Sequence, residues 1–117
     1  MEIVITNNPM VREKLRGRVL EFLDTDYLGI LKAVRDKIHL GHGLITHPLS
    51  GSVKPGETPY KTVIITGEKG SLDENALSIV EESIQTCVKL MLITGKKKIN
   101  HKMLADFQLI DYNLIFG

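Results

Sequence analysis

Short runs of β-branched residues alternate with segments of helical periodicity along this chain, and this alternation leaves few folds open to it. Residues 3–5 (Ile-Val-Ile) and 62–66 (Thr-Val-Ile-Ile-Thr) are the clearest runs, and residues 19–23 and 43–46 are predicted to form two further strands. The stretch 19–23 is also compatible with a helix. Strands that alternate with helices favour right-handed crossovers. We therefore predict a small doubly wound α/β fold, a three-layer sandwich around a short, mainly parallel four-stranded sheet.

Capping residues predict where the first two helices begin. Asn8, followed by Pro9, is typical of a helix start, and the helix should include residues 11–15. The Asp-Thr-Asp sequence at residues 24–26 offers a cap for a second helix, which should end at Gly41.

Two further helices are predicted in the last third of the chain. Ser71 and Glu74 form a capping box, which predicts a long third helix that Gly95 ends. A fourth helix is expected to begin near Asn100, where the apolar period is less regular. The expected apolar stripe of the third helix consists of Ala76, Leu77, Val80, Ile84, Cys87, Val88 and Met91.

Length and composition indicate one globular domain over residues 1–117. The chain is 43% hydrophobic and 25% charged, which is close to the globular average and sufficient for a core without disulfides or metal. Its 15 Lys and Arg residues nearly balance its 14 Asp and Glu residues. Because such a balance provides no broad positive field, we expect neither nucleic acid nor a membrane as a partner.

The first residues and the cysteine content predict a cytoplasmic protein. The sequence opens without a basic region followed by a long apolar run, so neither a signal peptide nor a transmembrane helix is expected. Cys87 is the single cysteine and has no C-x-x-C partner, which argues against a dithiol redox role. Its position on the apolar stripe predicts a buried thiol.

The long segment between residues 46 and 60 is the most informative for function. It holds three of the four prolines, and long loops of this kind usually carry a function or remain disordered. Ser50, Gly51, Ser52 and Lys54 combine hydroxyls, a permissive backbone and a cation, which together suit a carboxylate or phosphate. The alternative is a surface excursion, stiffened by proline, that binds nothing.

The sequence contains no complete motif for binding a nucleotide cofactor. The segment from Gly51 to Gly56 has the glycine spacing of a P-loop, but Glu57 stands where the lysine is required and a strand follows instead of a helix. A dinucleotide-binding G-x-G-x-x-G is absent. We therefore expect no cofactor.

The clusters of histidine and lysine indicate neither a metal site nor a nucleic-acid patch. His39, His42 and His47 are close in sequence, but a helix end and a predicted strand separate them, so no metal site is predicted. Residues 96–98 are three lysines that follow a helix end, where cations complement the terminal carbonyls better than they suggest a nucleic-acid patch.

In doubly wound folds, ligands bind beyond the carboxyl ends of the strands. If the predicted strands at residues 3–5 and 43–46 are neighbours, the turn at residues 6–8 meets the long loop. We then expect the loop to lie over that edge of the sheet. The predicted site for a small anionic ligand consists of Asn7, Asn8, Thr46, His47, Ser50, Gly51, Ser52, Lys54 and Lys61. The alternative is a small hydrolase or transferase acting on a phosphorylated or acylated metabolite, with His47 as acid/base and Ser50 as nucleophile. Whether the chain forms a homo-oligomer is left open.

Several stretches resemble one known family. The sequence Thr-Asn-Asn-Pro at residues 6–9, the segment 34–39 and above all the string at residues 46–61 are similar to the GrdX family. The resemblance covers most of the chain and is least recognisable in the last twenty residues. Members are encoded with components of glycine reductase and related amino-acid reductases, so the resemblance implies an accessory role in amino-acid fermentation, with a reductase component as a candidate partner. It implies no catalytic residues. Because the chain has neither selenocysteine nor a pair of thiols, a substrate-reducing role is not expected.

Overall fold

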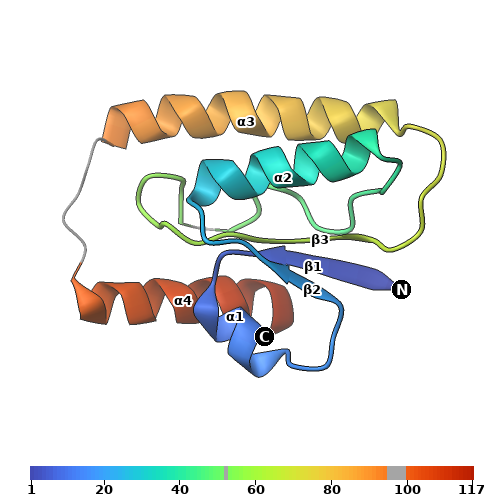
Figure 1. The fold of residues 1–117 in the computed structure, drawn as a ribbon. Coiled ribbons are helices and arrows are strands. Elements are labelled where there is room, and N and C mark those ends of the chain that lie inside the picture. The colour runs from blue at the N-terminus through green and yellow to red at the C-terminus, as the bar shows by residue number, and fades with distance from the viewer. Residues whose placement is uncertain (52, 95–99) are drawn as a thin grey trace.

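The computed structural model describes residues 1–51, 53–94 and 100–117. The elements are β1 (Glu2–Thr6), α1 (Pro9–Lys14), β2 (Leu20–Phe22), α2 (Tyr27–His39), β3 (Thr62–Thr66), α3 (Glu74–Thr94) and α4 (His101–Phe116). Strands and helices alternate from β1 to α3, and α4 is the next element after α3, as Figure 1 shows. The α/β class is confirmed, and so is strand structure within the predicted runs 3–5, 19–23 and 62–66.

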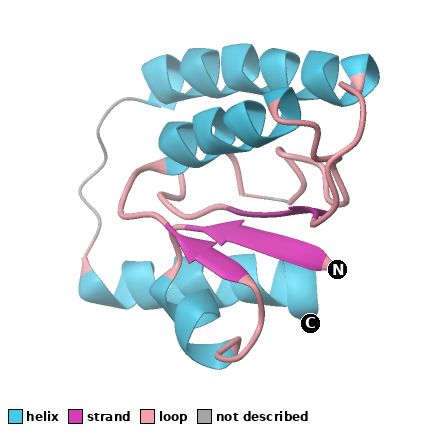
Figure 2. Ribbon diagram, turned by 45° about the vertical axis from the view of Figure 1, so that its right-hand side comes forward, coloured by secondary structure: helices cyan, strands magenta, loops and turns pink. Residues whose placement is uncertain are grey.

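The sheet has three strands and is mixed, which corrects the predicted four-stranded and mainly parallel sheet. Its order is β2-β1-β3. β1 pairs in parallel with β2, where Val4 lies opposite Leu20, and antiparallel with β3, where Val4 lies opposite Ile64. Helices α2 and α3 cover one face of the sheet and α1 and α4 the other, as Figures 1 and 2 show. The predicted three-layer arrangement is therefore present around a smaller sheet.

The prediction of a strand at residues 43–46 was wrong. A single bridge joins Leu44 to Ile65. Backbone bonds flank this bridge, because the Ile45 N–H donates to Ile64 O and the Thr66 N–H donates to Gly43 O, both at 2.9 Å. Threonine side chains take the next donors: the Ile64 N–H donates to Thr46 Oγ1 at 2.9 Å and the Gly43 N–H donates to Thr66 Oγ1 at 2.7 Å. Threonine hydroxyls compete with backbone groups for hydrogen bonds. The ladder therefore does not extend into a strand.

Strand β3 runs opposite to β1 because no helix intervenes between residues 46 and 62. A parallel connection needs a long crossover, usually a helix, whereas an antiparallel strand can return through a loop. Pro48, Pro55 and Pro59 disfavour a helix in this segment, which forms turns and bends. The chain therefore reverses direction, and β3 enters the sheet antiparallel to β1.

The predicted caps of α1 and α2 are confirmed, and so is the predicted start of α4 near Asn100. Asn8 Oδ1 accepts from the Met10 N–H at 2.9 Å, and Asp26 Oδ1 accepts from the Gly29 N–H at 2.8 Å. Asn100 likewise caps α4. Each side chain satisfies a backbone donor that has no partner in the first turn of a helix.

Helix α3 begins later than its predicted capping box. Asp73 Oδ1 accepts from the Ala76 N–H at 3.0 Å, so Asp73 is the cap and Ser71 lies before the helix. Aspartate caps a helix as well as serine does, and here the cap nearer the apolar stripe is used. Gly95, predicted to end this helix, lies outside the described residues.

The core consists of apolar clusters on both faces of the sheet. Ile3 and Ile5 of β1 point to the α2 and α3 side, where they meet Val34 and Val80. Val4 points the other way, into a cluster with α1 and α4. This alternation follows from the period of two along a strand. The sheet is thus covered on both faces, which leaves ligands access mainly at its edges and ends.

Helix α3 is the longest helix, with 21 residues. Cys87 is fully buried, as predicted, whereas Val88, assigned to the same stripe, is 40% exposed. Leu92 and Ile93 near the helix end are 78% and 80% exposed.

Across residues 1–51, 53–94 and 100–117, no helix combines the length and apolar character needed to cross a membrane.

Candidate functional site

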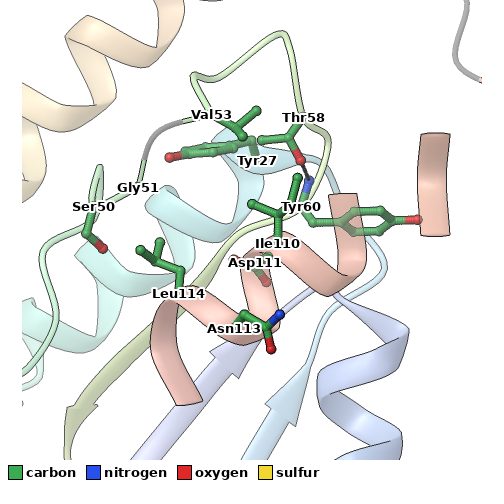
Figure 3. A pocket seen from close by; sticks show the side chains of 10 residues that line it. All are labelled: Tyr27, Ser50, Gly51, Val53, Thr58, Tyr60, Ile110, Asp111, Asn113 and Leu114. Carbon is green, nitrogen blue, oxygen red and sulfur yellow. Dashed lines mark hydrogen bonds between the residues drawn. The ribbon is translucent and has the colours of Figure 1, made fainter. Parts of the chain in front are cut away.

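A cavity of about 330 Å³ lies between the long loop and helix α4. Figure 3 shows the side chains that line it. Tyr27 comes from the start of α2, whereas the other lining residues come from the loop (Ser50, Gly51, Val53, Thr58, Tyr60) and from α4 (Ile110, Asp111, Asn113, Leu114). The volume is at the lower end of the range for small-molecule sites.

Asp111 is the charged residue among those described that line this cavity. Its side chain is buried, and its Oδ2 accepts from Thr62 Oγ1 at 2.7 Å and from Asn8 Nδ2 at 3.0 Å. Asn8 therefore caps α1 with its oxygen and holds α4 with its amide. These bonds fix the position of a carboxylate that would otherwise be costly to bury.

A directed series of hydrogen bonds ends on Asp111. The Asn8 N–H donates to Thr6 Oγ1 at 3.0 Å, and Thr6 Oγ1 lies 2.8 Å from Thr62 Oγ1. Because Thr62 gives its single hydroxyl proton to the carboxylate, Thr6 must be the donor in the bond between the two threonines. Every donor in the series thus points toward Asp111.

Lys61 lies under the loop and is 2% exposed. Its Nζ donates to Ser50 O at 2.7 Å and lies 5.7 Å from the centroid of the Tyr27 ring, within the range of a cation–π contact. Burial lowers the pKa of Lys61 from 10.5 to about 8, and the charge of Asp111 partly offsets this effect. Lys61 therefore supports the loop from below and is not among the lining residues.

Tyr27 also supports the loop from the start of α2. Its hydroxyl lies 3.4 Å from Pro48 O. Burial, with smaller contributions from the charges of Cys87 and Asp111, raises the pKa of Tyr27 well above its usual range. The phenol therefore stays neutral and presents an apolar ring with one polar end.

Asn7 holds the end of the loop at the carboxyl end of β1. Its Nδ2 donates to Pro59 O at 2.8 Å, and its Oδ1 accepts from the Lys61 N–H at 2.9 Å. The end of the loop thus lies beside the 6–8 turn, as predicted, but not through the predicted strand at residues 43–46. The reason is that β1 and β3 are neighbours, so the residues before Thr62 must lie beside those after Thr6.

The structure brings only part of the predicted site together. Ser50 and Gly51 line the cavity, Lys61 contacts Ser50 from beneath, and Asn7 and Asn8 anchor the two walls. Thr46 instead lies beside β3. Lys54 is exposed and is not among the lining residues, and Ser52 lies outside the described residues.

The side chains of His47 and Ser50 are not hydrogen-bonded to each other in the described structure. His47 Nδ1 accepts from the Leu49 N–H at 3.0 Å, and the Ser50 hydroxyl donates to the backbone oxygen of His47 at 2.9 Å. A serine nucleophile needs its hydroxyl bonded to the imidazole of the base. Here both side chains complete a turn of the loop.

The other histidines singled out from the sequence are not among the residues that line the cavity. His39 ends α2, and His42 Nδ1 lies 2.7 Å from Thr66 O, so this histidine pairs with the end of β3. Within the described part of the chain, no group of three His, Cys, Asp or Glu side chains is arranged to hold a metal ion. The lysines at residues 96–98 lie outside the described residues.

The GrdX-like protein family model matches residues 3–117, which is nearly the whole chain. The chain belongs to the GrdX family. The match includes the last twenty residues, where the resemblance is hardest to recognise by eye. Neither the curated proteins nor the solved structures contained a match.

The family-like string at residues 46–61 supplies the loop wall of the cavity, but the α4 wall was not predicted. Within residues 107–116, Asp111 is the one charged residue in an otherwise apolar and uncharged stretch. A single carboxylate in such a stretch indicates a buried acid with a structural or functional role. Its partners, Asn8 and Thr62, are too distant in sequence for any local pattern to reveal them.

Proposed function

We propose that this GrdX family member is a non-catalytic accessory protein of glycine or related amino-acid reductase metabolism, which binds a small ligand between its long loop and helix α4. The family name suggests the association with glycine reductase. The observation that carries the binding role is the cavity itself, walled by the family-like string on one side and by Asp111 and its helix on the other. A binding role fits better than catalysis because His47 and Ser50 are engaged with the backbone.

The walls of the cavity are joined by side chains from distant segments, which supports a built site over an incidental gap. Asn8 Nδ2 donates to Gln108 O at 2.9 Å as well as to Asp111, and Gln108 Nε2 donates to the Tyr60 hydroxyl at 2.9 Å. Helix α4 is therefore attached both to the 6–8 turn and to the end of the loop. Such bonds fix the positions of the two walls of the cavity relative to each other.

The charge distribution favours a different ligand from the anion expected from the loop sequence. Lys54, expected to attract an anion, is exposed, and the Lys61 ammonium is engaged with Ser50 O. Asp111 is the charged group that reaches the lining. A ligand that brings hydrogen-bond donors or a positive charge is therefore preferred to phosphate or a carboxylate.

A pair of variants on α4 tests the cavity. Leu114 and Leu109 are 45% and 46% exposed, but only Leu114 is among the lining residues. Leu114→Trp should fill the cavity, and Leu109→Trp is the matched control. We expect calorimetric titration with ethylamine, glycine, phosphate and acetyl phosphate to show binding of at least one compound to the wild-type protein and to Leu109→Trp, and its loss in Leu114→Trp. Equal binding by both variants, or no binding of any compound, would contradict the proposed role.

A reductase component is the second binding partner that the proposal includes, and the exposed part of the loop is where it would bind. Lys54 on the loop and Lys32 on α2 are both exposed, so Lys54→Ala and Lys32→Ala form a matched pair. We expect tagged wild-type protein and Lys32→Ala to retain a purified glycine reductase component, and Lys54→Ala to retain less. Equal retention by all three proteins would contradict binding through this part of the loop, and retention by none would remove this partner from the proposal.

A further inference from the structure

The two carboxylate oxygens of Asp111 have different surroundings. Oδ2 accepts both hydrogen bonds that Asp111 receives from the described residues, whereas Oδ1 receives none of them. Among the described side chains, no fully buried oxygen or nitrogen lacks a partner, so Oδ1 must be reachable by solvent. Since the side chain is only 6% exposed and lines the cavity, the solvent that reaches Oδ1 is that of the cavity.

The nearby positive charge of Lys61 does not form an ion pair with the Asp111 carboxylate. Lys61 is the buried cation of the region, but no ion pair between Lys61 and Asp111 is present in the described structure. The Lys61 ammonium is held by Ser50 O and faces the Tyr27 ring. A carboxylate oxygen that is fixed in a cavity and has no cation in direct contact is a strong acceptor for an ammonium group.

The walls around Asp111 are mainly apolar. Val53 of the loop and Ile110 and Leu114 of α4 contribute aliphatic surface, and Tyr60 contributes a ring. Ile110 and Leu114 are 43% and 45% exposed, so a ligand can still cover part of their surface. Burial of this surface would favour a ligand with an apolar substituent.

We infer that the cavity binds a small primary amine with a short apolar substituent, whose ammonium group donates to Oδ1 of Asp111 while the substituent packs between the loop and α4. The inference rests on the proposed ligand-binding role and names the chemical class of the ligand. An alcohol of the same shape would keep the apolar contacts but lose the charge, and a carboxylate would be repelled by Asp111.

Three ligands with the same isobutyl group separate charge from shape: isobutylamine, isobutanol and isovalerate. We expect calorimetric titration of the wild-type protein at neutral pH to show amine binding at least about tenfold tighter than alcohol binding, and no binding of isovalerate. Asp111→Asn removes the charge at similar volume and should weaken amine binding about tenfold while leaving alcohol binding unchanged. Alcohol binding as tight as amine binding, or tighter binding of isovalerate, would overturn the inference.

The test does not depend on Asp111→Asn folding. If circular dichroism shows that variant to be unfolded, the wild-type ligand series decides the charge, and Leu114→Trp decides the location. Amine binding should be lost in Leu114→Trp and kept in Leu109→Trp, and amine binding that survives in Leu114→Trp would overturn the location. Binding of isovalerate or phosphate that Leu114→Trp abolishes would overturn the inference but support the proposed function. Failure of every compound, including those used above, would contradict both.

Discussion

Asn7 and Lys61 are joined by a hydrogen bond in which the backbone N–H of Lys61 donates to Asn7 Oδ1 at 2.9 Å. The same side chain donates from Nδ2 to Thr25 O at 2.9 Å and to Pro59 O at 2.8 Å. One buried amide thus connects the turn after β1, the turn before α2 and the end of the long loop. The placement of the loop over the cavity depends on this connection.

Asn7→Ala should destabilise the protein strongly. It removes one acceptor and two donors and leaves the backbone groups of Thr25, Pro59 and Lys61 without this partner in a buried region. We expect a loss on the order of 3 kcal/mol in the free energy of unfolding, because each unsatisfied group costs about 1–3 kcal/mol before relaxation. Urea unfolding measures it. Asn113→Ala, at an exposed position of α4, is the control and should change stability by less than about 0.5 kcal/mol. Similar losses in both variants would contradict the anchoring role.

Thr62→Val should interrupt the hydrogen-bond series that ends on Asp111. Valine keeps the shape and the strand preference of threonine but removes the hydroxyl that donates to Asp111 and accepts from Thr6. A loss of about 1–3 kcal/mol in unfolding free energy is expected, because both partners stay buried. Thr86→Val on the exposed side of α3 is the matched control, with an expected change within about 0.5 kcal/mol. A Thr62→Val protein as stable as the control would show that the series does not hold α4.

Lys61 should make the stability of the protein rise with pH. Burial lowers the pKa of Lys61 to about 8 in the folded protein, whereas the pKa of a lysine in the unfolded chain is about 10.4. Between these values the unfolded chain binds more protons, so the free energy of unfolding increases with pH. The gain is absent below about pH 8 and on the order of 3 kcal/mol once the unfolded lysine is also neutral.

Lys61→Met isolates this effect. Tyr27 and Cys87, whose pKa values are raised by burial, titrate in both proteins and therefore cancel in the difference between them. Urea unfolding of both proteins from about pH 7 to about pH 9.5 should show the wild type gaining stability relative to Lys61→Met. A difference that stays constant over this range would show that Lys61 is not desolvated.

Gly41 should tolerate no side chain. Its φ is +105°, and a Cβ atom at this position would clash with Gly70 O because the two segments lie close together. Gly17 has a φ of +89° with nothing within 4 Å of a Cβ position, so Gly17→Ala measures backbone strain alone. We expect Gly17→Ala to cost about 1–2 kcal/mol and Gly41→Ala about 1–3 kcal/mol more, measured by thermal or urea unfolding. Equal costs would indicate that the segments near Gly41 and Gly70 separate freely.

Local signals in the sequence were sufficient for most of the secondary structure. Asn8, Asp26 and Asn100 cap helices because a short polar side chain satisfies backbone donors within three residues of itself. The β-branched runs at residues 3–5 and 62–66 form strands for an equally local reason, which is side-chain packing on a pleated surface. Where two local signals competed, as at Ser71 and Asp73, the prediction chose the wrong one.

Part of the loop wall of the candidate site was also predicted from the sequence. The proline-rich loop predicted Ser50 and Gly51 as lining residues because its composition is unusual over a short span. The same composition suggested an anion through Lys54, which points to solvent instead. Charge in a sequence does not tell which side chains a fold buries.

The direction of β3 and the assembly of the cavity depended on contacts between distant residues. The sequence predicts that residues 62–66 form a strand, but only its pairing with β1 makes it antiparallel. Likewise, Asp111 becomes a site residue because Asn8 and Thr62, which lie 103 and 49 positions away, donate to it. Hydrogen bonds across such separations leave no periodic or capping pattern in the chain, since their free energy is gained only when the packed layers bring the partners together.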